Sequence, residues 1–89
     1  MTYYTIRDAS GSIVCGGSDR RHCERHREIE IEDALFSIAY ERDCLPRSLQ
    51  WCNSHRLRAR HIRWHRERMA QAKARLRYWQ GAEIQERMS

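Results

Sequence analysis

The hydrophobic positions at the start of the chain favour β-strands. The segment TYYTIRD (2–8) is rich in strand-forming residues, and SIVCG (12–16) follows after a short break. Between them, Asp8-Ala9-Ser10-Gly11 suits a type I turn with Gly11 in the left-handed conformation, a common hairpin connection. We therefore predict a β-hairpin over 1–17. Two strands alone are marginally stable in water, so this hairpin must pack on another element.

A change in the hydrophobic pattern near residue 31 predicts a first helix. Residues 18–30 begin as a polar, turn-rich stretch, and we predict a loop there. From residue 31 the apolar positions follow the i, i+3, i+4, i+7, i+8 spacing of a helix over 31–44, through Ile31, Ala34, Leu35, Ile38 and Ala39. Pro46 is expected to end this helix, because the residue before a proline avoids the α conformation.

A second and longer helix is predicted over 46–80. Proline suits its first turn, Gly81 suits its end, and only Asn53-Ser54 interrupts it weakly. An unbroken helix would be about 50 Å long. We therefore expect it either to break near 53–54 or to project beyond the domain, with 81–89 as a tail. The expected class is α+β and mostly helical: one small domain with an N-terminal β-hairpin, a short helix and a long Arg-rich C-terminal helix.

The long helix has a heptad pattern with two series of positions offset by three. The first series is Ile62, Met69 and Leu76, and the second is Trp51, Arg58, His65, Ala72 and Trp79. Before residue 70 we expect this seam to pack against the first helix and the hairpin. Beyond it, self-association through Met69, Leu76 and Trp79 would give a homodimer.

The charge of the chain is unevenly distributed along its length. Residues 1–45 contain six Arg and nine Asp or Glu, whereas residues 46–89 contain eleven Lys or Arg and three Asp or Glu. Such a chain can bind an anion with its basic end, or its two halves can attract each other when folded. Sixteen of the seventeen basic residues are Arg. Arg binds phosphate bidentately, although a GC-rich genome would give the same bias.

The stretch HRLRARHIRWHRERM (55–69) contains six of these arginines and one acidic residue, Glu67, so ion pairs between successive turns do not account for them. We predict nucleic-acid contact, to DNA or RNA, through Arg56, Arg60, Arg63 and Arg66. Trp64 lies beside them, where it could stack on a base. Binding of this kind comes mainly from phosphates and is sensitive to salt. The alternative is an ordinary solvated helix surface.

A second functional hypothesis is docking on another protein. Arg and Trp are common anchors of protein interfaces. The size and style of the chain fit the small inhibitors that phages and mobile elements direct at a host protein or ribonucleoprotein complex, anti-CRISPR proteins among them. No particular residue specifies this hypothesis.

Two Cys-x-x-His pairs, CERH (23–26) and CNSH (52–55), could supply the four ligands of one structural zinc. The site of Cys23, His26, Cys52 and His55 would require residues 16–27 to form a loop folded back over the second helix. Otherwise we expect no cofactor, with Cys15, Cys44 and Cys52 as small buried residues and Cys23 as a surface thiol.

The segment CGGSDRR (15–21) contains Cys-x5-Arg, the spacing of a phosphate-binding loop in Cys-dependent phosphatases. Asp19 within it would repel phosphate, and the preceding strand belongs to a hairpin, so we expect a binding protein and not an enzyme. The N-terminus MTYYTIRD does not have the layout of a signal peptide, and the apolar cluster ALFSIAY (34–40) is too short to span a bilayer. We therefore expect a cytoplasmic protein without membrane contact, whose cysteines are thiols or metal ligands.

Overall fold

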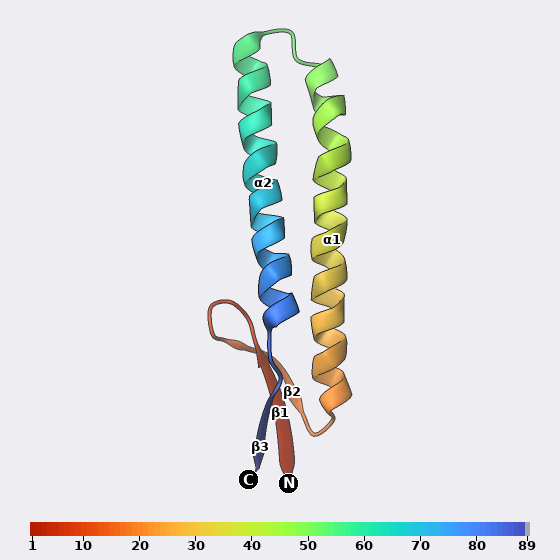
Figure 1. Cartoon of the computed structure of the whole chain (residues 1–89), viewed down its shortest axis with the longest axis vertical. Helices are drawn as coiled ribbons and strands as arrows, with labels where there is room; N and C mark the ends of the chain where they lie inside the picture. The colour runs from red at the N-terminus through yellow and green to blue at the C-terminus, as the bar shows by residue number, and fades with distance from the viewer. Residues whose placement is uncertain (89) are drawn as a thin grey trace.

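A long helical hairpin stands on a small β-sheet in the computed structural model, which describes residues 1–88 (Figure 1). The elements follow the order β1 (Thr2–Arg7), β2 (Ile13–Gly17), α1 (Arg20–Gln50), α2 (His55–Gly81) and β3 (Gln85–Met88). The molecule is elongated and measures 62 × 19 × 15 Å. The predicted α+β class, mostly helical with an N-terminal β-hairpin, is confirmed.

The β-hairpin has the predicted turn. β1 and β2 pair in antiparallel fashion, and Gly11 adopts a φ of 89°, a conformation that favours glycine. The Gly11 N–H donates to the Asp8 carbonyl at 3.0 Å. The Asp8 carboxylate accepts hydrogen bonds from the backbone N–H groups of Ser10 and Ser12, both at 3.0 Å. Local turn chemistry therefore closes this hairpin.

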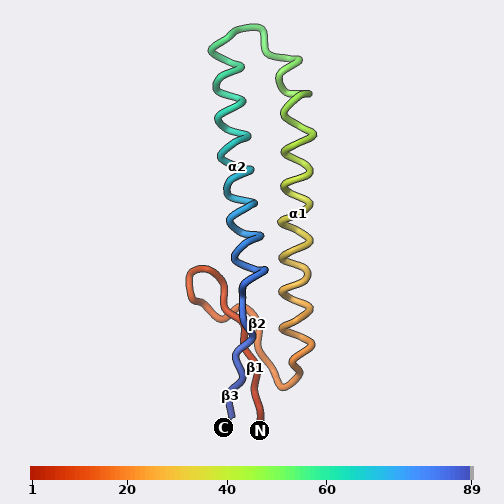
Figure 2. Tube along the Cα trace, in the orientation of Figure 1, coloured from red at the N-terminus to blue at the C-terminus, as the bar shows by residue number. Residues whose placement is uncertain are grey.

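A third strand supports the hairpin where the sequence predicts a tail over 81–89. β3 pairs with β1 in antiparallel fashion, from Thr2 opposite Met88 to Thr5 opposite Gln85, and the sheet has the order β2-β1-β3. The prediction of a tail is wrong because β3 is an exposed edge strand held by its backbone, with none of the apolar alternation that reveals a half-buried strand. The two ends of the described chain lie side by side at the sheet (Figure 2).

The predicted bounds of both helices are wrong, although the position of the break between them is right. α1 begins at Arg20 and includes most of the predicted loop 18–30, because the Asp19 side chain caps it by accepting a hydrogen bond from the Arg21 N–H. Pro46 lies inside α1, within its last two turns, where one lost hydrogen bond does not end the helix. Residues 51–54 then reverse the chain, so the predicted helix 46–80 is divided between α1 and α2 near the predicted break at 53–54.

The core lies at the junction between the sheet and the helical hairpin. It consists of Ile6, Cys23, Trp79 and Ala82, packed against partly buried neighbours from all parts of the junction. The Trp79 ring contacts the His26 ring edge-on at a centroid distance of 5.6 Å. Farther from the sheet, the residues buried between α1 and α2 are Ala34, Ala72, Glu41 and His65. The upper part of the hairpin is therefore joined by small and polar side chains.

None of the helices formed by residues 1–88 has both the length and the apolar character needed to cross a membrane.

Candidate nucleic-acid interface

The basic side chains of α2 fall into two groups, one of which holds the helices together. α2 carries nine Arg or Lys residues and a single acidic residue. Arg68 binds Glu41 of α1 at 2.5 Å, and Arg75 binds Glu30 at 2.8 Å and Asp33 at 2.5 Å. Hydrogen bonds to these two carboxylates raise the pKa of the Arg75 guanidinium. The acidic half of the chain thus attracts part of the basic half, as one of the sequence-based alternatives proposes.

The second group is free of such partners. Arg56, Arg60, Arg63 and Arg66 are exposed and form no ion pair with any of residues 1–88. Arg56, Arg60 and Arg63 follow the i, i+4, i+7 spacing of one helix face, opposite the buried His65 and Ala72. Arg66 lies beside them and lines a shallow groove with Arg63. We call these four residues the arginine ridge.

Trp64 flanks the arginine ridge, and one face of its ring contacts the Arg68 side chain. Its side chain is 49% exposed, and the Arg68 guanidinium lies 4.7 Å from its ring centroid. The same Arg68 binds the buried Glu41, so the orientation of the Trp64 ring is linked to the contact between the helices. The ring face remote from Arg68 is the part that could stack on a base.

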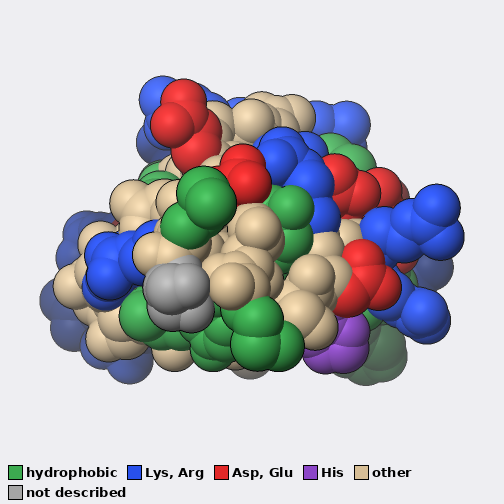
Figure 3. All heavy atoms as spheres, turned by 90° about the horizontal axis from the view of Figure 1, so that it is seen from below, with side chains coloured by type: hydrophobic (Ala, Val, Ile, Leu, Met, Phe, Trp, Pro, Cys, Tyr) green, Lys and Arg blue, Asp and Glu red, His purple; other side chains and the backbone are tan. Residues whose placement is uncertain are grey.

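The position of the ridge within the hairpin leaves its positive charge unbalanced. Residues 42–68, at the end of the hairpin remote from the sheet, contain eight Arg and two acidic residues. Residues 24–41 contain six acidic residues and two Arg, and they lie beside the Lys and Arg residues near the end of α2. Seen from the sheet end, acidic and basic side chains are intermixed with hydrophobic ones (Figure 3). The far end therefore carries most of the unbalanced positive charge of the hairpin, the kind of surface that attracts anions.

A buried polar network that the sequence did not reveal joins the helices below the ridge. Glu41 and His65 are 3% and 4% exposed. His65 Nδ1 lies 2.5 Å from Glu41 Oε2, and His65 Nε2 lies 3.2 Å from Ser48 Oγ. Arg68 Nε donates to the other Glu41 oxygen. One feature of the sequence could have indicated this network. His65 is a polar residue within a heptad series, and a buried polar side chain requires a polar partner on the facing helix.

Ser48, His65 and Glu41 are connected in the order of a Ser-His-acid hydrolase triad. The surroundings do not suit acyl transfer. Ser48 lies inside α1, where backbone N–H groups bond along the helix and do not converge on a developing oxyanion. We therefore interpret the network as a polar layer that fixes how α1 and α2 align.

The charge state of Glu41 makes this layer sensitive to acid. Burial raises the pKa of the Glu41 carboxyl, but hydrogen bonds from Arg68 and His65 outweigh burial, so its pKa falls below the ordinary 4.5. A lowered pKa contributes stability above the ordinary value, and this contribution is lost as the pH falls through the folded-state pKa.

We expect the difference in unfolding free energy between the wild type and Glu41→Gln to shrink as the pH falls from about 6 to about 3. Urea unfolding, followed by helical circular dichroism at several pH values, measures this difference. The pKa of Asp8 is also lowered, chiefly by the Ser10 hydroxyl, so Asp8 also contributes stability that is lost at low pH. Because both proteins contain Asp8, its contribution cancels in the difference. A difference that stays constant with pH would show that Glu41 is not ionised in the folded state.

The four residues predicted to bind zinc are not brought together. Cys23 and Cys52 lie at opposite ends of α1, about 40 Å apart along its axis. Cys23 is fully buried, and burial raises the pKa of its thiol, which disfavours the thiolate that zinc requires. His26 packs against Trp79, and His55 begins α2. No group of three or more potential metal ligands occurs within residues 1–88. The zinc prediction failed because residues 20–27 are helical and do not fold back.

The residues predicted for self-association have different environments. Trp79 is 5% exposed in the core of its own chain, so it is not a free contact. Ala72 and His65 of the same series face α1, which extends the expected core packing beyond residue 70. Met69 and Leu76 are only partly buried and remain accessible.

The Cys-x5-Arg segment forms the connection between β2 and α1. Its Asp19 carboxylate already accepts the Arg21 N–H at 3.0 Å, where a phosphate would have to bind. The Cys15 thiol points to the His22 carbonyl at 3.8 Å. Asp19 therefore acts as a helix cap. A phosphate-binding loop would need the Arg21 N–H to be free for phosphate.

No protein-family model, curated protein or solved structure matches this chain. A function for it therefore has to come from the geometry of its own residues.

Proposed function

We propose that the protein binds nucleic acid, DNA or RNA, with the arginine ridge of α2. The observation that carries this proposal is the division of the arginines: Arg68 and Arg75 hold the helices together, whereas the four ridge arginines are exposed without ion pairs among residues 1–88. A solvated surface alone does not require so dense a cluster with Glu67 as its only nearby acid on α2.

The chemistry of the ridge suits a phosphate backbone. From Arg56 to Arg66 the helix rises about 15 Å, which covers several phosphates of a nucleic-acid strand. Each guanidinium can bind phosphate oxygens bidentately, and Trp64 can add stacking on an unpaired base. Contacts of this kind position the protein without reading the sequence. A binding protein of this type needs no cofactor, and its four free thiols fit a cytoplasmic location.

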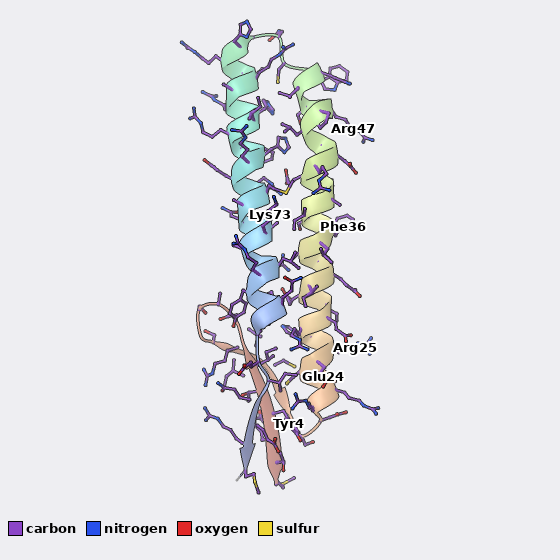
Figure 4. The ribbon with its side chains drawn as sticks, viewed as in Figure 1. Tyr4, Glu24, Arg25, Phe36, Arg47 and Lys73 are labelled. Atoms are coloured by element: carbon purple, nitrogen blue, oxygen red, sulfur yellow. The ribbon has the colours of Figure 1, made fainter. Side chains whose placement is uncertain are left out.

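The test compares two triple variants that lose the same charge. In fluorescence anisotropy with duplex DNA and single-stranded RNA at low salt, Arg56→Ala/Arg60→Ala/Arg63→Ala should weaken binding at least about tenfold. The control, Arg21→Ala/Arg25→Ala/Arg87→Ala, removes exposed arginines near the sheet, where Arg25 is labelled in Figure 4, and should bind nearly as the wild type does. Equal weakening by both variants would indicate a general charge effect and contradict a defined ridge.

The docking hypothesis is supported by a different surface. Ile29, Phe36 and Tyr40 are each at least half exposed and follow the i, i+7, i+11 spacing of one face of α1, and the rings of Phe36 and Tyr40 stack at a centroid distance of 6.3 Å. Figure 4 labels Phe36 on this face. Exposed aromatic residues of this kind are common anchors in protein interfaces. An inhibitor that docks on a host protein is therefore our second candidate. If the wild-type chain binds no nucleic acid at low salt, that result would favour this candidate.

A further inference from the structure

A row of aliphatic side chains lies uncovered along one side of the helical hairpin. Leu35 is 50% exposed, and the other members are only partly buried. A groove between the helices on this side is lined by Leu45 and Pro46 of α1 and by Met69 of α2, so residues of both helices face the same way. We call this surface the aliphatic face; its members are Leu35, Ile38, Leu45, Leu49, Ile62, Met69 and Leu76.

The spacing of the aliphatic face is that of a second heptad seam. Positions 35, 38, 42, 45 and 49 of α1 alternate by three and four, and positions 62, 66, 69, 73 and 76 of α2 do the same. Seven of these ten positions are aliphatic, and the other three are the basic residues Arg42, Arg66 and Lys73. These rows differ from the series of His65, Ala72 and Trp79, which already packs against α1 and the core. Each helix therefore carries two seams, as do helices that contact two neighbours in a four-helix bundle.

The exposed area of the chain also indicates a missing partner. Its accessible surface is 7071 Å². A compact monomer of 10.8 kDa would expose about 5,500 Å². The excess of about 1,500 Å² exceeds the roughly 800 Å² per partner that a typical stable interface buries. A single layer of two helices has an open side, and a second layer would close it.

We propose that a second copy of this chain covers the aliphatic face, forming an antiparallel four-helix bundle with its twofold axis near Leu35. Glu28 and Arg42 lie seven residues on either side of Leu35, on the same row of α1. Both are exposed and have no ion pair with residues 1–88. A twofold axis at Leu35 places Arg42 of each copy opposite Glu28 of the other, which gives two equivalent ion pairs.

The opposite orientation is disfavoured by charge. If the copies ran in the same direction, α1 of one would lie on α2 of the other, and Arg42 would face Arg66, because both line the groove at the same level. In the antiparallel arrangement Lys73 approaches its counterpart, but its flexible stem can carry the charge to solvent. Arg56, Arg60 and Arg63 point away from this face, and of the arginine ridge only Arg66 borders the groove. Dimerisation therefore leaves three of the four ridge arginines accessible to nucleic acid.

The first test measures the mass of the full chain by size-exclusion chromatography with light scattering, in high salt and without nucleic acid. We expect twice the 10.8 kDa of one chain. Leu35→Glu should give a monomer with unchanged helical circular dichroism, raising the dimer Kd at least about a hundredfold, because it would bury a charge. Phe36→Glu is the matched control: the neighbouring residue is more exposed, lies on another face of α1 and should leave the dimer intact.

The second test addresses the orientation. Glu28→Arg and Arg42→Glu should each weaken the dimer, and the double variant should restore it. A wild-type chain that is monomeric at high micromolar concentration would overturn the proposal, as would a dimer that survives Leu35→Glu or dissociates only with Phe36→Glu. A double variant weaker than both single variants would overturn the antiparallel arrangement.

Discussion

The Trp79→Ala variant is expected to lose about 3–5 kcal/mol of unfolding free energy, the largest effect of any single truncation in this protein. Trp79 is 5% exposed and belongs to the buried cluster at the junction of sheet and hairpin, with Ile6, Cys23 and Ala82. These residues come from β1, from α1, from α2 and from the segment that follows it. Loss of the indole would therefore separate the sheet from the hairpin as well as leave a cavity.

Urea denaturation followed by circular dichroism measures this effect, and Trp51 supplies the control. Trp51 is 85% exposed in the turn between the helices, so Trp51→Ala should change stability by less than about 0.5 kcal/mol. Equal losses in the two variants would contradict a core centred on Trp79.

The second large effect is expected for Glu41→Ala, at about 1–3 kcal/mol, because it leaves the buried His65 ring without the carboxylate that accepts its hydrogen bond. Arg68 loses the same carboxylate, but its side chain is 50% exposed and can turn to water. The matched control is Glu67→Ala, which removes an exposed carboxylate of α2 and should cost less than about 0.5 kcal/mol.

A double variant separates the value of the pair from the cost of breaking it. Glu41→Leu/His65→Leu removes both buried polar groups, and such replacements are often neutral or stabilising. We therefore expect its stability to exceed that of Glu41→Ala. If Glu41→Ala itself costs less than about 1 kcal/mol, the network does not hold the helices in alignment.

How far the sequence predicts this fold depends on whether the signals are local. The β-hairpin was predicted because Asp8 and Gly11 fix its turn within a few residues. The first half of α1 was missed because its buried face contains Cys23 and polar residues, which give no amphipathic pattern. β3 was missed because all four of its side chains are exposed and only its backbone is paired. Pro46 was given too much weight as a helix end: it removes one backbone hydrogen bond, but α1 continues past it to Gln50.

The site shows the same division. The exposed row of ridge arginines was predicted because its residues lie on consecutive turns of one helix, a spacing that sequence alone displays; nucleic-acid binding by this row stays a prediction. The network of Glu41, Ser48 and His65 was not, because His65 reaches Glu41 across twenty-four positions only after the hairpin forms. The zinc hypothesis failed for a related reason, since two matching Cys-x-x-His pairs reveal nothing about the helix that separates Cys23 from Cys52.

The most direct test of nucleic-acid binding by the arginine ridge is the salt dependence of the affinity of the wild-type chain for duplex DNA. If the four ridge arginines neutralise four phosphates, a plot of log K against log salt concentration should have a slope of about −3.6 per bound chain. The Arg56→Ala/Arg60→Ala/Arg63→Ala variant should reduce the slope to about −0.9. Absence of binding at low salt, or an unchanged slope in the variant, would contradict the proposed function.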